Sequence, residues 1–412
     1  MKTYILLPMG ITGMGGGQMY VRNRMMYLKR KGCNVYIYSG LEGSIILPEL
    51  EEFKSKILLE LSCSPFVYTS KFVKTIINRI RDDIEKDCIV DDVIIESYTA
   101  HMAYWGEIIA EYFNGRNLVY LLDERNDKLV PKEYLDYFSF KFARHELAGI
   151  NKLSLKQLFR ESEISPKYDD YSLPALCQNV TSDEKNDLVI EHADLTIGRI
   201  GRLDKPYVDY MLNSVIDYCS LKQDKMYNLV LIGGAESSER EKQIIAKFSK
   251  VHNINLYITG FLFPIPLDLI NSIDIFISSA GSAGVSYRAQ KTTISLDAKD
   301  GMPIGVLGYT TMNSLYRGNE EPIALPVLLK KILEEGYLNK FTFFKSDELN
   351  EYKNWIQHEN FWRVSEKVER IYYPVMDSRP TQKDLIKWAV CQIMGCNVLL
   401  CTKKIIKRIK RK

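Results

Sequence analysis

A short segment rich in arginine and lysine could neutralise an anion. Residues 197–206 read IGRIGRLDKP and place Arg199, Arg202 and Lys205 just after an apolar run. A departing diphosphate needs its growing negative charge balanced, and preorganised Arg and Lys side chains can do this in place of a metal ion. Charged loops are also common on protein surfaces, so the meaning of the segment depends on where the fold places it.

A second segment, residues 279–284, is built from small residues. It reads SAGSAG and follows the apolar run that ends at Ser278. Gly281, Ser282, Ala283 and Gly284 would let a ligand approach the backbone closely. A helix that begins there would aim its first N–H groups at phosphate, with Ser279 or Ser282 available as its cap. Two phosphate-type segments in the same half of the chain predict one anion site.

A glycine-rich turn follows the first apolar run. Residues 13–17 read GMGGG, and Gly15, Gly16 and Gly17 directly precede a helical pattern. A strand, a glycine turn and a helix start form an anion site. A dinucleotide fingerprint is disfavoured, because Gln18 stands where its third glycine belongs and the second strand ends in Ser39-Gly40 rather than in an acidic residue. No Gly-Lys-Ser/Thr follows, which excludes a P-loop.

Side chains able to act on an acceptor follow other strands of the first half. Glu96, His101, Asp123 and Glu124 each come after an apolar run. A general base must reach the hydroxyl that it deprotonates, and a carboxylate or an imidazole suits this role. His101 is the preferred candidate, while residues 123–127 also fit a plain surface loop.

These residues are positioned by alternating strands and helices. Continuous apolar strands separated by helical patterns predict parallel sheets covered on both faces, and the alternation occurs twice. At 412 residues the chain exceeds what one core usually organises. We expect two Rossmann-like doubly wound domains facing a central cleft, which holds the ligand at the strands' carboxyl ends. The predicted bounds are 1–185 for an acceptor domain, 186–365 for a nucleotide-sugar domain and 366–412 for C-terminal helices with a basic tail.

The second half resembles the glycosyltransferases of family 4 and their relatives with the GT-B fold. The matching motifs are Gly201-Arg202-Leu203 with Lys205, the strand that ends in Gly233-Gly234, Thr259-Gly260-Phe261, and the strand from Asp274 to Ser278. In the first half the glycine turn and residues 148–154 are similar. The resemblance implies that Arg202 and Lys205 bind the donor diphosphate, with Phe261 nearby. It also implies that Gly16 and Gly17 let the backbone approach the donor phosphate and sugar.

The chain departs from this family at two positions. Where the family carries two glutamates across the small-residue turn, this chain has Ser278 and Ser286. A serine can hydrogen-bond a ribose or sugar hydroxyl but carries no charge. Retaining and inverting stereochemistry therefore both stay open. No Asp-x-Asp tripeptide occurs, so we expect neither a metal ion nor another cofactor, only the nucleotide-sugar donor.

Composition and the C-terminus bear on location. The eight cysteines form no C-x-x-C and no zinc spacing, and the N-terminus lacks the pattern of a signal peptide, so a reducing cytoplasm is expected. Residues 385–401 are largely apolar, with Lys387 the only charge and Trp388 among them, and the last ten residues carry seven Lys or Arg. This pattern predicts a helix at an anionic membrane surface, while a helix packed on the first domain is also open. Nothing accompanies the tail that would read a nucleic acid, so none is expected.

The sequence thus predicts transfer of a sugar from a nucleoside-diphosphate donor to a glycan or lipid-linked acceptor, in surface polysaccharide biosynthesis at the inner face of the cell membrane. Two alternatives remain open. A GT-B sugar-nucleotide epimerase would use the same cleft without an acceptor. A non-catalytic sugar-nucleotide-binding protein would fit the serines that replace the carboxylates.

Overall fold

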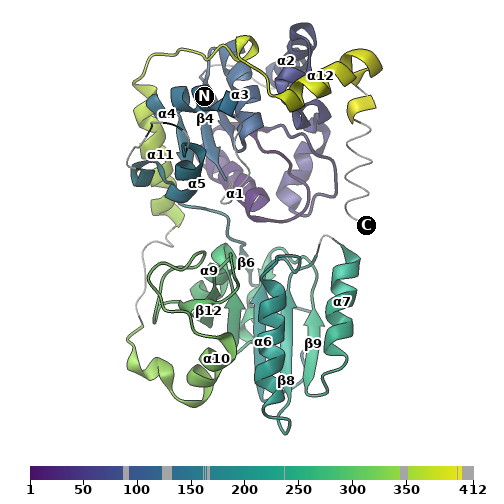
Figure 1. Ribbon diagram of the computed structural model, residues 1–412, viewed down its shortest axis with the longest axis vertical. Helices are drawn as coiled ribbons and strands as arrows, with labels where there is room; N and C mark the ends of the chain where they lie inside the picture. The colour runs from purple at the N-terminus through teal and green to yellow at the C-terminus, as the bar shows by residue number, and fades with distance from the viewer. Residues whose placement is uncertain are drawn as a thin grey trace. The chain divides into compact units, whose positions relative to one another are not determined.

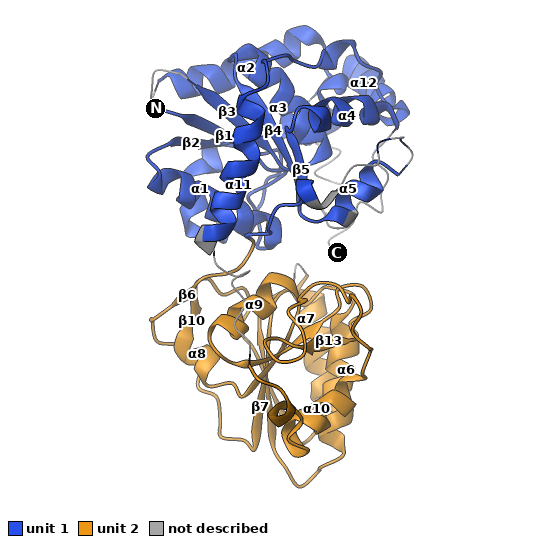
Figure 2. Cartoon of the chain, turned by 90° about the vertical axis from the view of Figure 1, so that its left-hand side faces the viewer, with its two compact units in different colours: residues 1–176, 350–410 blue, residues 177–349, 411–412 orange. Residues whose placement is uncertain are grey.

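The computed structural model describes residues 1–86, 92–122, 132–160, 162, 164, 168–235, 237–343, 351–396 and 398–400. The chain forms two compact α/β units, coloured separately in Figure 2. Unit 1 comprises Met1–Leu176 and the segment that begins at Asn350, and unit 2 comprises Cys177–Leu349. The prediction of two Rossmann-like units is confirmed, and each is described below by itself.

Unit 1 is built on a five-stranded parallel sheet with the order β2-β1-β3-β4-β5. Its strands are β1 (Thr3–Leu7), β2 (Asn34–Ile37), β3 (Val93–Ser97), β4 (Arg116–Leu121) and β5 (Leu147–Gly149). Its helices are α1 (Gly16–Arg30), α2 (Ser70–Glu85), α3 (Ala100–Tyr112), α4 (Leu135–Ala143), α5 (Lys152–Leu158), α11 (Glu351–Glu366) and α12 (Gln382–Met394). Short 3-10 helices connect them: η1 (Pro48–Lys56), η2 (Leu59–Ser62), η3 (Pro65–Val67), η4 (Lys132–Tyr134), η5 (Tyr168–Tyr171) and η8 (Val375–Asp377).

The sheet of unit 1 is buried on both faces, which explains its continuous apolar strands. One face of alternate residues, such as Ile5 and Ile95, packs with buried residues of α2 and α3. On another face Tyr20 of α1 lies within 5.8 Å, ring centre to ring centre, of Trp355 in α11.

The C-terminal segment returns to unit 1 earlier than the sequence predicted. The sequence placed residues 350–365 with the second domain, whereas α11 belongs to unit 1. The reason is visible in its side chains: Trp355 and His358 are buried, and Glu359 accepts a hydrogen bond from the Tyr27 hydroxyl of α1 at 2.6 Å. The first boundary also differs, because unit 2 begins at Cys177 rather than at residue 186.

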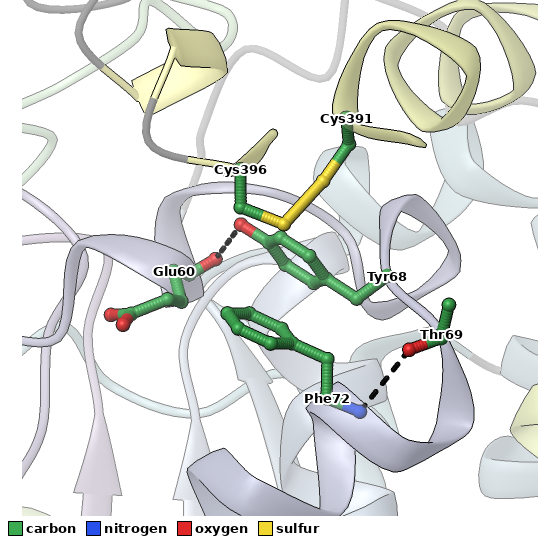
Figure 3. Close-up of a disulfide and its surroundings, with 6 residues drawn as sticks. All are labelled: Glu60, Tyr68, Thr69, Phe72, Cys391 and Cys396. Atoms are coloured by element: carbon green, nitrogen blue, oxygen red, sulfur yellow. Dashed lines mark hydrogen bonds between the residues drawn. A yellow bond between two sulfur atoms is a disulfide. The ribbon is translucent and has the colours of Figure 1, made fainter. Parts of the chain in front are cut away.

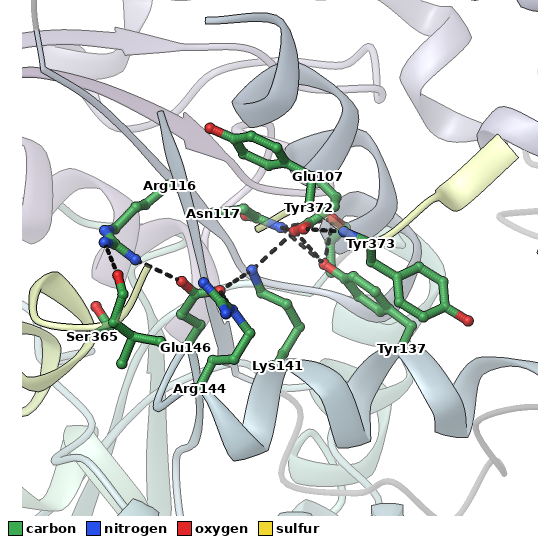
Figure 4. Close-up of polar contacts among 12 residues, drawn as sticks. Glu107, Arg116, Asn117, Tyr137, Lys141, Arg144, Glu146, Ser365, Tyr372 and Tyr373 are labelled. Atoms are coloured by element: carbon green, nitrogen blue, oxygen red, sulfur yellow. Dashed lines mark hydrogen bonds and ion pairs between the residues drawn. The ribbon is translucent and has the colours of Figure 1, made fainter. Parts of the chain in front are cut away.

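A buried polar network holds this returning segment in place (Figure 4). The Lys141 ammonium lies between two carboxylates, 2.9 Å from Glu107 and 2.6 Å from Glu146. Arg116 pairs with Glu146 and donates to the backbone carbonyl of Val368. Arg116 begins β4 and Glu146 directly precedes β5, so the network lies at the edge of the sheet where the strands start.

The end of α12 carries a disulfide between Cys391 and Cys396 (Figure 3). Gly395, at a φ of 84°, turns the chain back and brings the two Cα atoms to 4.6 Å, within the range that a disulfide can bridge. Cys391 packs in the same core cluster as Tyr68. The sequence predicted reduced cysteines, so this pair departs from that prediction.

Unit 2 contains a six-stranded sheet with the order β13-β12-β11-β7-β8-β9, in which only β13 is antiparallel. Its strands are β7 (Leu195–Ile200), β8 (Tyr227–Ile232), β9 (Ile254–Ile258), β11 (Ile275–Ser278), β12 (Thr292–Leu296) and β13 (Pro303–Val306). The strands β6 (Thr181–Ser182) and β10 (Ile265–Pro266) pair separately. Its helices are α6 (Val208–Ser220), α7 (Ser238–Phe248), α8 (Leu267–Asn271), α9 (Ala280–Arg288), α10 (Leu325–Glu334) and the 3-10 helix η6 (Tyr337–Lys340) (Figure 1).

Helices cover both faces of this sheet as well. Residues of α6, α7 and α10 form one core cluster with the sheet, and residues of α8 and α9 form another. In a doubly wound sheet the ligand sits outside the carboxyl ends of the strands, at the point where the strand order reverses. That point lies between β7 and β11 in unit 2, and between β1 and β3 in unit 1.

Candidate functional site

At the switch point of unit 2 lie the two segments that the sequence predicted to bind phosphate, residues 197–206 and 279–284. β7 and β11 are paired neighbours in the sheet, and both run in the same direction. The chain leaves β7 into Gly201, Arg202 and Lys205, and it leaves β11 into α9. A Cβ atom placed on Gly201 would lie 3.3 Å from the Ser282 hydroxyl oxygen, so the two loops are in contact. The structure thus brings these predicted residues together.

The start of α9 has the features of an anion-binding helix end. It has no side-chain cap hydrogen bond and no acidic residue in its first turn. Ala280 has a left-handed φ of 54°, and its N–H donates to the Ser314 carbonyl. The first turn consists of small residues, with Gly281 and Ser282 partly exposed. Backbone N–H groups at such a helix start favour a negatively charged ligand.

Arg202 and Lys205 belong to the loop whose Gly201 meets this helix start, but their charges are balanced differently. The Arg202 guanidinium makes two hydrogen bonds to the Asp204 carboxylate, at 2.9 Å from Nε and 2.6 Å from Nη2. Lys205 is exposed. The positive charge of Arg202 is therefore partly neutralised by its own loop, a pairing that the sequence analysis did not anticipate.

Two glycines that the sequence did not assign to the site fix the shape of this edge. A Cβ atom on Gly233, which follows β8, would lie 2.2 Å from the Gly201 carbonyl oxygen, so only glycine fits there. Gly233 also bridges to Gly260, which has a φ of 70°. Phe261 comes next, and its ring would lie 3.0 Å from a Cβ atom on Gly234. The loops after β7, β8 and β9 therefore pack together and place Phe261 at the same edge.

Ser278 and Ser286 do not face a ligand, which corrects the prediction that they contact the donor. Both are fully buried. The Ser278 hydroxyl accepts a hydrogen bond from the Ile200 N–H at 3.0 Å, which fastens β11 to β7. The Ser286 hydroxyl donates to the Ala283 carbonyl and accepts from the Thr293 hydroxyl at 2.9 Å, which fastens α9 to β12. At these positions a small hydroxyl satisfies internal bonds that a longer carboxylate would disrupt.

The switch point of unit 1 carries the glycine turn. Gly15 precedes α1 in an extended conformation, and Gly16 and Gly17 form its exposed first residues. This helix start also has no side-chain cap and no acidic residue in its first turn. A Cβ atom on Gly17 would meet nothing within 4 Å. The turn therefore has open space beside Gly17, and its contact with a ligand stays a prediction.

The acceptor-side candidates separate in the structure. His101 lies in the first turn of α3, directly after β3, and is partly exposed. Glu96 is 2% exposed, and its carboxylate accepts hydrogen bonds from Arg24 and from the Tyr98 hydroxyl. The structure thus assigns Glu96 to the core, where it holds α1 against β3, and corrects its placement at the acceptor. Asp123 and Glu124 lie outside the described residues.

No group of three or more His, Cys, Asp or Glu side chains is placed to hold a metal ion in the part of the chain that the structure describes. Among the same residues, no helix has the length and apolar character that crossing a membrane requires.

Comparisons with known proteins give the fold a name. No protein-family model matches the chain, and no curated protein matches it either. The solved structure of Anabaena HepE in complex with UDP-glucose is similar, with a TM-score of 0.55 and 12% identity, over 89% of this chain and 100% of that one. A glycosyltransferase from Rickettsia africae has a TM-score of 0.54 and 15% identity, over 88% and 95%. The two Rossmann-like units are those of the GT-B fold.

Proposed function

We propose that this chain is a glycosyltransferase that transfers a sugar from a nucleoside-diphosphate donor to a glycan or lipid-linked acceptor in surface polysaccharide biosynthesis. The observation that carries this proposal is the switch point of unit 2, where the uncapped start of α9 meets the arginine-bearing loop after β7. The HepE structure in complex with UDP-glucose supports a uridine nucleotide as the first donor to test.

In the proposed mechanism, unit 2 stabilises the leaving nucleoside diphosphate. The N–H groups of the first turn of α9 that follow Ala280 bind the phosphate oxygens, while Arg202 and Lys205 balance the charge that develops as the sugar departs. These fixed donors take the place of a metal ion. The roles of Gly16 and Gly17 in approaching the sugar, and of His101 as the general base of an inverting transfer, stay predictions from the sequence.

A panel of nucleotide sugars tests the proposal. Wild-type protein is incubated with each sugar nucleotide, with and without a membrane extract as the source of acceptor, and nucleotide release is followed. A transferase releases nucleotide only when acceptor is present, an epimerase interconverts the sugars without one, and a silent binding protein does neither. Nucleotide binding without turnover under every condition would sink the transferase assignment.

Arg202→Ala is the matched test of the phosphate site. We expect it to lower turnover roughly a hundredfold, as the loss of one preorganised charge-stabilising group does. Lys222→Ala is its control, because Lys222 belongs to unit 2 but lies after α6, at the other end of the sheet, in a partly exposed pair with Glu334. Equal turnover in the two variants would exclude Arg202 from the phosphate site.

We further propose that the C-terminus holds the enzyme at the inner membrane face. α12 exposes large apolar side chains to solvent: Leu385, Ile386, Trp388, Ile393 and Met394. The cationic residues 403–412, which lie outside the described residues, follow after residues 395–402 in the sequence. An apolar helix face beside Lys and Arg residues suits the interface of an anionic leaflet.

Liposome flotation separates these contributions. Wild-type protein should float with vesicles containing phosphatidylglycerol and not with pure phosphatidylcholine. Deletion of residues 403–412 should abolish flotation at physiological salt, and Ile393→Ser should weaken it. Lys367→Ala, which removes a surface charge from unit 1, is the control. Unchanged flotation of the deletion variant would refute the role of the tail.

A further inference from the structure

Unit 2 buries a positively charged side chain that has no acidic partner among the residues that the structure describes. Arg199 is 1% exposed, and its Nε and Nη1 atoms have no hydrogen-bond partner in the described part of the chain. Its Nη2 atom makes one long hydrogen bond, 3.4 Å, to the Arg202 carbonyl oxygen. Its guanidinium lies 5.3 Å from the ring centre of Tyr207. Because a guanidinium stays charged at any ordinary pH, unit 2 carries a full buried charge here.

The position of Arg199 relates this charge to the proposed nucleotide site. Arg199 is the last residue but one of β7, next to the switch point. A Cβ atom on Gly201 would lie 3.8 Å from the Arg199 Nη2 atom and 3.3 Å from the Ser282 hydroxyl oxygen. The guanidinium and the first turn of α9 therefore lie around the same glycine, where the partial positive charge of the helix start adds to that of Arg199.

The other cations of the site cannot replace this charge. The Asp204 carboxylate partly neutralises the charge of Arg202. Lys205 is exposed, and water and salt screen its charge. A buried charge is screened far less, and its attraction for an anion extends further. Burying it without a carboxylate is costly for folding, and a ligand that brings negative charge would offset that cost.

We propose that Arg199 supplies the electrostatic attraction for the diphosphate of a nucleotide bound at the start of α9, acting from beneath the site without contacting the ligand. This inference rests on the proposed function, since it requires an anionic ligand at that place. It assigns to Arg199 a role that depends on its charge and not on a directed hydrogen bond. A lysine at position 199 should then serve, and a neutral side chain should not.

Calorimetric titration with UDP and with uridine tests this role, because only UDP carries the diphosphate. Arg199→Met should weaken UDP binding roughly tenfold or more, as expected for the loss of one buried charge several ångströms from the phosphates. Its uridine affinity should stay within about twofold of wild type. Arg199→Lys should restore most of the UDP affinity. Lys222→Met is the matched control, since it removes one positive charge from the same unit at a distance from the site.

A thermal melt of the ligand-free proteins provides a second readout. The ligand-free Arg199→Met variant should have a Tm no lower than that of wild type, because the substitution removes an unneutralised buried charge. The rise in Tm on adding UDP should be smaller for the variant than for wild type. UDP affinity equal to wild type overturns the inference and leaves the proposed function intact. A lower Tm with UDP and uridine weakened alike also overturns it, by showing a structural role. If wild-type protein binds no nucleotide, the proposed function fails and takes this inference with it.

Discussion

Arg24 in unit 1 and Arg199 in unit 2 are buried to the same extent, but a carboxylate neutralises the charge of Arg24 and none of the described carboxylates neutralises that of Arg199. Each is 1% exposed. The Arg24 guanidinium pairs with Glu96 and lies 5.3 Å from the ring centre of Trp355. Arg199 has an aromatic neighbour but no carboxylate among the described residues. A paired buried charge holds elements of the fold together. An unpaired buried charge at a strand end is not neutralised by the protein and can attract an anionic ligand.

In the polar network of unit 1, as at Arg24, the buried cation is paired with carboxylates. Lys141 is as buried as Arg199 but lies between Glu107 and Glu146 (Figure 4). It is located where the strands begin, at the edge of the sheet opposite to the glycine turn. Buried charge is thus neutralised at the edge that holds the C-terminal segment, and it is left unneutralised at the proposed binding edge of unit 2.

Arg24→Met should cause the largest loss of stability in this comparison. It would leave the Glu96 carboxylate buried without its cation, which costs about 3–5 kcal/mol when one partner of a buried pair is removed. Urea unfolding monitored by tryptophan fluorescence measures it. Lys29→Met, which breaks an exposed pair with Glu52, should cost under about 1 kcal/mol. If Arg24→Met lowers the free energy of unfolding no more than the control does, Arg24 is not a stabilising partner of Glu96, and the contrast with Arg199 fails.

His358 should make the stability of unit 1 sensitive to acid. Burial, opposed by a hydrogen bond to the Pro174 carbonyl and assisted by the nearby Arg24 charge, lowers the pKa of His358 to about 3. Its folded pKa is depressed, so the neutral form is favoured in the fold and an unfolded chain binds a proton more readily. The contribution is fully present above about pH 6.5 and declines as the pH falls toward 3. At pH 5 the loss should be about 2 kcal/mol.

His358→Gln tests this, because glutamine does not titrate. Its free energy of unfolding, followed from pH 7.5 to pH 5 in urea, should fall less than that of wild type by about the same 2 kcal/mol. Parallel pH profiles for the two proteins would show that His358 is not the group responsible. Unit 2 does not contain this histidine, so a probe confined to unit 2 should report no such difference.

The sequence predicted the architecture well because periodicity and glycine turns are local signals. Both doubly wound units are present, and the segments 199–205 and 279–284 meet at one switch point as expected from their places after strands. What the sequence could not reveal was pairing across the fold. Glu96 stands near the end of β3, where a binding residue would be expected, but Arg24, 72 positions earlier, pairs with its carboxylate.

The same limit explains the serines and the domain bounds. Ser278 and Ser286 stand where a related family has carboxylates, but only the partners Ile200 and Thr293 reveal that both are core residues. The sequence of α11 does not indicate which unit the helix joins, and its return to unit 1 depends on where Trp355 and His358 are buried. Arg199 stood beside Arg202 in one basic segment, and only burial and hydrogen-bond partners separate their roles.

Among these variants, Asp204→Asn should have the smallest effect on UDP affinity. It tests directly how the charges of Arg199 and Arg202 differ. Burial by itself raises the pKa of the Asp204 carboxyl, but hydrogen bonds and attraction from Arg202 outweigh it and hold the pKa below its usual value, so the pair is ionised at neutral pH. Asparagine keeps the shape and removes the charge that neutralises Arg202. UDP affinity should then rise about threefold, in keeping with the small energy of a partly exposed ion pair.

Calorimetric titration of the single variants and of Asp204→Asn with Arg199→Met decides between charge and geometry. If net charge controls binding, the double variant should recover part of the affinity that Arg199→Met loses, since removing the Asp204 carboxylate makes the loop after β7 more positive and offsets some of the charge removed at position 199. If Asp204→Asn instead weakens UDP binding, Asp204 orients the Arg202 guanidinium toward the phosphates. The loop after β7 would then bind the nucleotide through a fixed geometry, and the contrast between Arg199 and Arg202 would be one of contact and not of charge.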